Sequence, residues 1–136
     1  MEIVQFNMSM YKEVFEIWKE TGLTLGASDT RDQVERSLAY SKDLFLVGIE
    51  EGKIVAVVLG AFDGRRGYVH HLSVNPTFQK LGYGRHMMEE LHKKFKKMDV
   101  KKVHLFIEVD NEGVKEFYLK MGWHVRDDLM MMSYVP

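Results

Sequence analysis

Apolar side chains return every three or four residues in four stretches of the chain, the period typical of amphipathic helices. The first stretch places Val14 and Trp18 on one stripe, and the third places Leu91 and Phe95 on another. We therefore expect four helices, each with one face toward a core. They begin after a cap at Asn7 or Ser9, at a capping box over Thr30–Gln33, at Gly84 and at Asn111, and the last two end at Lys97 and Met121.

Short runs of β-branched and aromatic residues, bounded by turn residues, predict the strands. The turn signals Glu50–Lys53 and Asp63-Gly64 join neighbouring runs as hairpins. The resulting order, β-α-α-β-β-β-α-β-α-β-β, predicts an α/β fold with a mixed sheet and one crossover unit. The predicted strands are Glu2–Phe6, Leu44–Ile49, Ile54–Phe62, Tyr68–Val74, Lys102–Val109, Trp123–Arg126 and Leu129–Tyr134.

Size and charge exclude several classes of protein. A chain of 136 residues suits a single domain, which we place at 1–136. Lys and Arg number 19 and Asp and Glu 20, so the net charge of −1 gives no basic field for nucleic acid. The lack of cysteine excludes a cysteine nucleophile, and the six histidines show no metal-ligand spacing. We also find no signal peptide and no membrane-length apolar run, which favours a cytoplasmic protein.

The segment between the fourth predicted strand and the third helix favours an anion. Gly82 and Gly84 allow a ligand to approach the backbone closely. Arg85 and His86 occupy the first helical turn, and the first acid is Glu89. Cations are unfavourable at the positive end of a helix unless an anion binds there, so we expect a phosphate ligand. The P-loop ending and the third glycine of a dinucleotide fingerprint are both missing.

Two motifs raise this expectation to a family resemblance. The pattern Val74-x-Pro76-x-x-Gln79-x-x-Gly82-x-Gly84 resembles the acetyl-coenzyme A signature of the GNAT superfamily of N-acyltransferases. Asn111 followed by Phe117-Tyr118-Leu119-Lys120-Met121-Gly122-Trp123 resembles the second landmark of that family, and the element order resembles its whole fold. The resemblance covers nearly all of the chain and is most specific over 68–123.

The resemblance implies how acetyl-coenzyme A would bind. In this family the fourth strand splays from the fifth, and the pantetheine arm lies in the gap like an added strand. The Val74 N–H would polarise the thioester carbonyl. The implied cofactor-binding residues are Leu72, Ser73 and Val74 on the strand, Gln79, Lys80, Leu81, Gly82, Tyr83, Gly84 and Arg85 in the loop and helix start, and Asn111, Phe117 and Lys120 on the later helix.

The same resemblance implies the catalytic candidates. Tyr118 would give a proton or a hydrogen bond to the leaving thiolate. Many relatives carry a glutamate base on the fourth strand, but this chain has Tyr68-Val69-His70-His71-Leu72 there, so we take His70 as its substitute. Because strand neighbours face opposite ways, we expect only one of His70 and His71 to serve. Glu108 on the next strand is the alternative base.

These features predict an N-acetyltransferase in which a primary amine attacks acetyl-coenzyme A directly, because no cysteine is present to carry the acetyl group. The acceptor would be a small-molecule or peptide amine. A homodimer through the C-terminal strands is common among relatives. Two alternatives stay open: a non-catalytic acyl-coenzyme A sensor, which the missing strand acid favours, and a nucleotide-binding regulator, which rests on the helix start alone.

Overall fold

The structure is a computed structural model that describes the backbone of residues 1–136 and every side chain except that of Lys42. The chain divides into two compact units, Met1–Phe106 and Ile107–Pro136. The prediction of a single domain over 1–136 stays a prediction. None of the described helices combines the length and apolar composition needed to cross a membrane.

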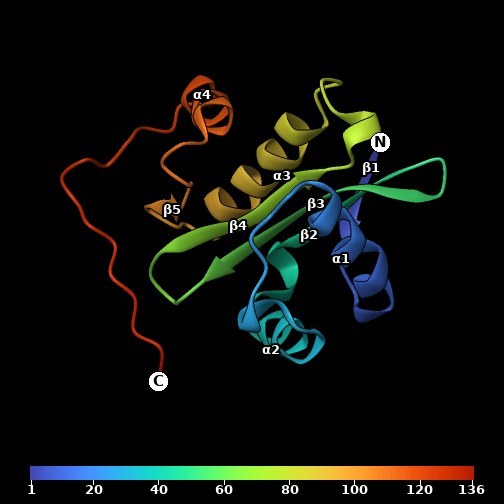
Figure 1. The fold of residues 1–136 in the computed structure, drawn as a ribbon, viewed down its shortest axis with the longest axis horizontal. Helices are drawn as coiled ribbons and strands as arrows, with labels where there is room; N and C mark the ends of the chain where they lie inside the picture. The colour runs from blue at the N-terminus through green and yellow to red at the C-terminus, as the bar shows by residue number, and fades with distance from the viewer. The chain divides into compact units, whose positions relative to one another are not determined.

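The first unit is built on a mixed sheet of five strands, in the order β1-β2-β3-β4-β5 (Figure 1). The first four strands are antiparallel neighbours, and β5 adds to β4 in parallel. Hairpins join β2 to β3 and β3 to β4, as the turn signals predicted, and the α/β class with a mixed sheet is confirmed. The strands are β1 (Glu2–Gln5), β2 (Phe45–Glu50), β3 (Lys53–Phe62), β4 (Gly67–Val74) and β5 (Val103–Leu105).

Helices cover both faces of this sheet (Figure 1). On one face α1 (Tyr11–Glu20) and α2 (Arg31–Ser41) bury Trp18 and Val34 against alternate residues of β2 and β3, including Val57. On the other face lies α3 (Tyr83–Lys97), which buries Met87, Met88, Leu91 and Phe95. Single 3₁₀ turns occur at Met8–Met10, Ala27–Asp29, Lys42–Leu44 and Pro76–Phe78.

Glycines on the sheet allow α3 to approach closely. A Cβ added at Gly60 would lie 2.8 Å from a Leu91 methyl carbon, and one added at Gly67 would lie 2.6 Å from the Phe95 ring. Real Cβ atoms essentially never lie that close to a neighbour, so a side chain at either position would force the Leu91 or Phe95 side chain to move. The close contact holds the N-terminal part of β4 firmly against α3.

The second unit contains α4 (Glu112–Lys120). The Asn111 side chain accepts a hydrogen bond from the Val114 N–H, and Gly122 follows the helix with a φ of +93°, so both predicted ends are confirmed. Tyr118 is 7% exposed and packs its ring against those of Phe117 and Trp123.

The two C-terminal strands predicted over Trp123–Arg126 and Leu129–Tyr134 are wrong, because residues 123–136 form no helix or strand. Strand propensity reports how well side chains fit a half-buried pleated surface, and it specifies no pairing edge. Here the apolar side chains of Met130 and Met132 stay more than four fifths exposed, at 85% and 87%, so no sheet face receives them. The predicted dimer contact through these strands stays a prediction.

Candidate functional site

One edge of β4 is open beyond its first three residues. β5 pairs only with Gly67–Val69, so His70 and the residues after it have no strand partner on that side within the described residues. The strand predicted over Lys102–Val109 is therefore shorter in the structure, where it covers only Val103–Leu105. The Asn75 N–H donates to the Val55 carbonyl at 2.8 Å across the β3 ladder. Since antiparallel hydrogen bonds alternate, the Val74 N–H points to the open edge, and so does that of Leu72 two residues earlier.

The open edge leads into the loop 75–82 and the start of α3. Gly82 occupies the position just before α3 and has a φ of +83°. It has no side chain to accept a hydrogen bond from the helix start, and the first turn holds no acid. The next backbone N–H groups therefore have no intrahelical partner, and the helix dipole adds positive charge. Lys80 also has a positive φ of 65°. A Cβ placed at Gly82 would meet nothing within 4 Å, so this part of the loop faces open space.

Several side chains of the predicted cofactor site are already engaged elsewhere. Gln79 donates its amide N–H to the Val74 carbonyl at 3.0 Å, which folds the loop back onto the strand. The Tyr83 hydroxyl donates to Glu50 at 2.8 Å. The Ser73 hydroxyl lies 3.2 Å from that of Thr21 on the helical side of the sheet. These residues are therefore left to offer a ligand their backbone groups rather than their side chains.

Charge at the loop comes from side chains exposed to solvent. Arg85 is paired with Glu89, its Nε lying 2.9 Å from the carboxylate, and both side chains are about half exposed. Leu81 is 61% exposed at the tip of the loop. An exposed ion pair contributes little stability, so a phosphate can compete for Arg85. The open strand edge, the uncapped helix start and this cation together fit the pantetheine arm and pyrophosphate of coenzyme A.

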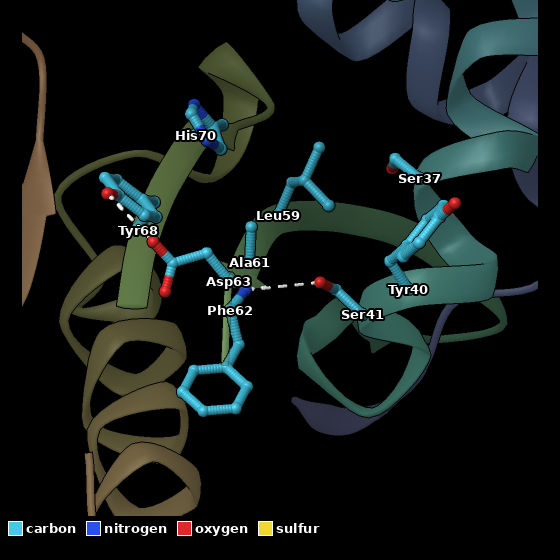
Figure 2. Close-up of a pocket in the computed structure, with 9 residues that line it drawn as sticks. All are labelled: Ser37, Tyr40, Ser41, Leu59, Ala61, Phe62, Asp63, Tyr68 and His70. Carbon is cyan, nitrogen blue, oxygen red and sulfur yellow. Dashed lines mark hydrogen bonds between the residues drawn. The ribbon is translucent and has the colours of Figure 1, made fainter. Parts of the chain in front are cut away.

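His70 lines a pocket of about 320 Å³ on the face of the sheet that carries α2 (Figure 2). The wall is formed by Tyr40 of α2, Leu59 of β3 and Tyr68 beside His70. Burial lowers the pKa of His70, the charge of His71 lowers it further, and Asp29 opposes both. The His70 imidazole is therefore neutral near physiological pH and has a lone pair available.

The expectation that His70 and His71 face opposite sides of β4 is wrong. The β3–β4 register slips by one residue, because Val57 pairs with Ser73 whereas Leu59 pairs with His70. A bulge of this kind interrupts the alternation of side chains. His71 consequently turns to the same face of the sheet as His70, where its ring lies 5.1 Å from that of Trp18.

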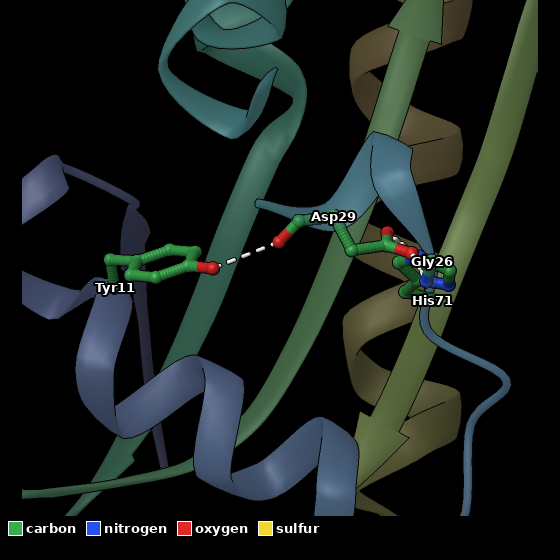
Figure 3. A network of polar contacts seen from close by, with 4 residues as sticks. All are labelled: Tyr11, Gly26, Asp29 and His71. Atoms are coloured by element: carbon green, nitrogen blue, oxygen red, sulfur yellow. Dashed lines mark hydrogen bonds and ion pairs between the residues drawn. The ribbon is translucent and has the colours of Figure 1, made fainter. Parts of the chain in front are cut away.

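His71 and Asp29 form a pair that the sequence analysis did not predict, since it took His70 as the base. The His71 Nε2 lies 2.6 Å from a carboxylate oxygen of Asp29, in the connection between α1 and α2 (Figure 3). The sequence predicts no such pairing, because Asp29 lies 42 residues before His71 and a bulge in β4 leaves no signal in the local pattern. Among the described residues, no group of three or more His, Cys, Asp or Glu side chains is placed to hold a metal ion.

The remaining predicted residues lie in the second unit. Burial raises the pKa of Tyr118 well above its ordinary value, so its phenol keeps its proton. Phe117 and Lys120 lie on the same helix, and Asn111 caps it. Glu108 lies beyond the end of β5, and its backbone carbonyl accepts the Asn111 N–H at 2.9 Å. Glu108 therefore does not lie on a strand, as the prediction of a strand up to Val109 had it.

Comparison with known proteins agrees with this arrangement. The model of the acetyltransferase (GNAT) family matches residues 8–123. An acetyltransferase of Yersinia enterocolitica is 32% identical over 131 residues, covering 96% of this chain and 93% of the relative. A second, from Sodalis glossinidius, is 30% identical and covers 98% and 94%. The crystal structure of the PaiA N-acetyltransferase from Thermoplasma acidophilum, in complex with coenzyme A, superposes with a TM-score of 0.83 at 17% identity, covering 93% of this chain and 91% of that one.

The fold, the open edge of β4 and the glycine-bearing start of α3 thus occur in a chain whose sequence matches one family over most of its length. Members of that family use acetyl-coenzyme A and acetylate amines. The protein is an acetyltransferase and belongs to the GNAT family.

Proposed function

We propose that the protein transfers an acetyl group from acetyl-coenzyme A to the nitrogen of a primary amine, by direct attack within a ternary complex. The observation that supports this most strongly is the continuity of the open β4 edge with the uncapped, acid-free start of α3. That surface offers extended backbone groups for amides and then helix N–H groups for phosphate. The lack of cysteine removes the usual covalent carrier and favours direct attack.

Most of the predicted cofactor residues have a part in this proposal. The N–H groups of Leu72 and Val74 bind the arm and its carbonyl at the strand edge. The backbone from Gln79 to Arg85 holds the pyrophosphate. Asn111, Phe117 and Lys120 contribute from α4. Acetyl-coenzyme A supplies the activated acetyl group as a thioester.

Acetyl transfer requires two proton movements: one proton leaves the acceptor ammonium before attack, and one reaches the sulfur of coenzyme A as it leaves. An aliphatic amine with a pKa near ~10.4 is almost entirely protonated at neutral pH, so a base must remove one proton before attack. The β4 imidazoles and Glu108 are the candidates, and the neutral His70 beside the pocket satisfies the requirement for a free lone pair. Tyr118, whose pKa is raised by burial, would stabilise the leaving thiolate by a hydrogen bond rather than by complete proton transfer.

The test has two stages. Thermal unfolding with acetyl-coenzyme A, compared with adenosine nucleotides, reports cofactor binding. Transfer is then measured on a panel of primary amines: an arylalkylamine, a polyamine, an amino-acid ester and a peptide with a free N-terminus. Stabilisation by acetyl-coenzyme A with acetylation of at least one amine supports the proposal. Stabilisation without any transfer favours the acyl-coenzyme A sensor, and stabilisation by adenosine nucleotides alone favours the nucleotide-binding regulator.

A further inference from the structure

His71 has an unusual backbone conformation and lies where the edge of β4 is open. Its φ is +52°, a left-handed value that side-chain-bearing residues adopt at a cost of about 1–2 kcal/mol. It lies in the β4 bulge, two residues after Val69, the last residue of β4 that pairs with β5. Strain of this kind persists only where the surrounding structure holds it, and it gathers at active sites and ligand clamps.

Three contacts hold the carboxylate partner of His71 in place (Figure 3). One Asp29 oxygen lies 2.6 Å from His71 Nε2, and the other accepts the Gly26 N–H at 2.8 Å. The Asp29 backbone carbonyl accepts the Tyr11 hydroxyl at 2.8 Å, which ties the 3₁₀ turn to α1. The Asp29 side chain is 13% exposed, so both carboxylate oxygens are used and largely withdrawn from solvent.

These contacts determine which imidazole nitrogen is available. Because Nε2 faces a carboxylate, the neutral His71 ring carries its proton there and keeps the lone pair on Nδ1. The His71 side chain remains 23% exposed, so a ligand can reach the ring. The ring packs against that of Trp18 in a T-shaped arrangement, and Trp18 is fully buried, which restricts the movement of the His71 ring. A carboxylate that orients a histidine in this way is the arrangement of a general base.

We propose that His71, oriented by Asp29, is the base that takes the proton from the acceptor ammonium, and that His70 instead lines the pocket that holds the acceptor. This inference rests on the proposed acetyl transfer. His71 is next to Leu72, whose N–H faces the open strand edge, and its ring lies on the same face of the sheet as the pocket that His70 lines. In this role Asp29 is a positioning residue and His71 a catalytic one.

The proton balance of the step is complete. The ammonium gives one proton to His71 Nδ1 and becomes a neutral amine, whose lone pair forms the new N–C bond. The thioester C–S bond breaks and the sulfur leaves with the electron pair. The second amine proton ends on that sulfur, giving free coenzyme A as a thiol, and His71 returns its proton to solvent. One proton is therefore released for each ammonium acetylated.

The experiment compares His71→Gln and Asp29→Asn with Asp32→Asn, an exposed acid in the first turn of α2. We expect His71→Gln to lower kcat about 10²- to 10⁴-fold, the range for loss of a general base, with KM changed little. Asp29→Asn should lower kcat at least about tenfold, because the ring loses its orientation. Asp29→Glu should restore part of this loss, and Asp32→Asn should behave as the parent protein.

A second readout needs neither cofactor nor acceptor. In ¹⁵N spectra of the ligand-free protein, His71 should show the tautomer protonated at Nε2, and Asp29→Asn should convert it to a mixture. An unchanged kcat in His71→Gln, or a His71 ring protonated at Nδ1 in the parent, would overturn the inference. Thermal stabilisation by acetyl-coenzyme A separates this failure from a failure of the proposed function, because it does not depend on either residue.

Discussion

The glycine at the start of α3 offers the sharpest test of the cofactor site. Gly82 has a φ of +83°, and a Cβ placed there would meet nothing within 4 Å. Gly82→Ala therefore adds backbone strain of about 1–2 kcal/mol without any clash inside the protein. If the loop keeps its shape, that strain lowers the free energy of unfolding. If the loop relaxes, the same energy lowers the affinity for coenzyme A, by about tenfold for each ~1.4 kcal/mol.

The expected size of the effect follows from the chain length. At about 2.1 cal/mol/K per residue, unfolding 136 residues carries an entropy near ~0.29 kcal/mol/K. Ligand at 100 times its Kd adds about 2.7 kcal/mol, so the parent protein should gain about 9 °C in Tm. With a tenfold weaker Kd, the same ligand concentration adds about 1.4 kcal/mol, so Gly82→Ala should gain only about 5 °C.

The matched control is Gly64→Ala, in the turn between β3 and β4. Gly64 has a φ of +96° and likewise no atom within 4 Å of an added Cβ, so its backbone strain is comparable. We expect Gly64→Ala to lose stability but to keep the full ligand-induced shift. The same shift in Gly82→Ala as in the parent would refute the placement of the pyrophosphate at this helix start. An equal loss in both variants would refute the argument that the effect is local.

Four further substitutions, one of them a control, test other parts of the structure. Tyr118→Phe should lower kcat about 10- to 1,000-fold with unchanged coenzyme A affinity, and an unaltered kcat would remove the phenol from the mechanism. Burial lowers the pKa of His70 from its ordinary value of 6.5, so around and below that pH the folded state binds fewer protons than the unfolded state. The free energy of unfolding, measured by urea titration, should therefore decrease as the pH falls below 6.5. This decrease should be smaller in His70→Gln. Gly60→Ala, whose Cβ would lie 3.0 Å from the Leu44 carbonyl, should cost about 1–3 kcal/mol. Gly113→Ala, with open space around it, should show no loss in the same thermal measurement.

Local signals predicted the elements that depend on local chemistry. The cap at Asn111, the glycine after α4 and the Glu50–Lys53 turn all act within a few residues, and the structure confirms each of them. The C-terminal strands failed for the opposite reason. A strand forms only where it pairs with the edge of another strand, and the local sequence of residues 123–136 does not indicate which strand that would be.

In the candidate site too, features that depend on local sequence were predicted and features that depend on distant residues were not. The glycine-bearing loop and the helix start could be found from spacing, because a backbone anion site needs particular residues in a fixed order. The His71–Asp29 pair could not, because it depends on a register slip between β3 and β4 and joins residues 42 apart in the chain. Alternation along a regular strand led to the wrong face for His71, and only the bulge corrects it.

The positions of unusual backbone connect these two parts of the site. Four residues other than glycine have a positive φ. Glu51 lies in a hairpin turn and Asp99 follows the end of α3, where left-handed residues are routine. The other two, His71 and Lys80, lie at the start of the open β4 edge and in the loop that ends it. Folding alone would favour glycine at both positions, whereas a base needs the imidazole and a phosphate site benefits from the ammonium. The strain thus coincides with the two places where the proposed acetyl transfer uses a side chain, which favours one continuous substrate-binding surface from the bulge to α3.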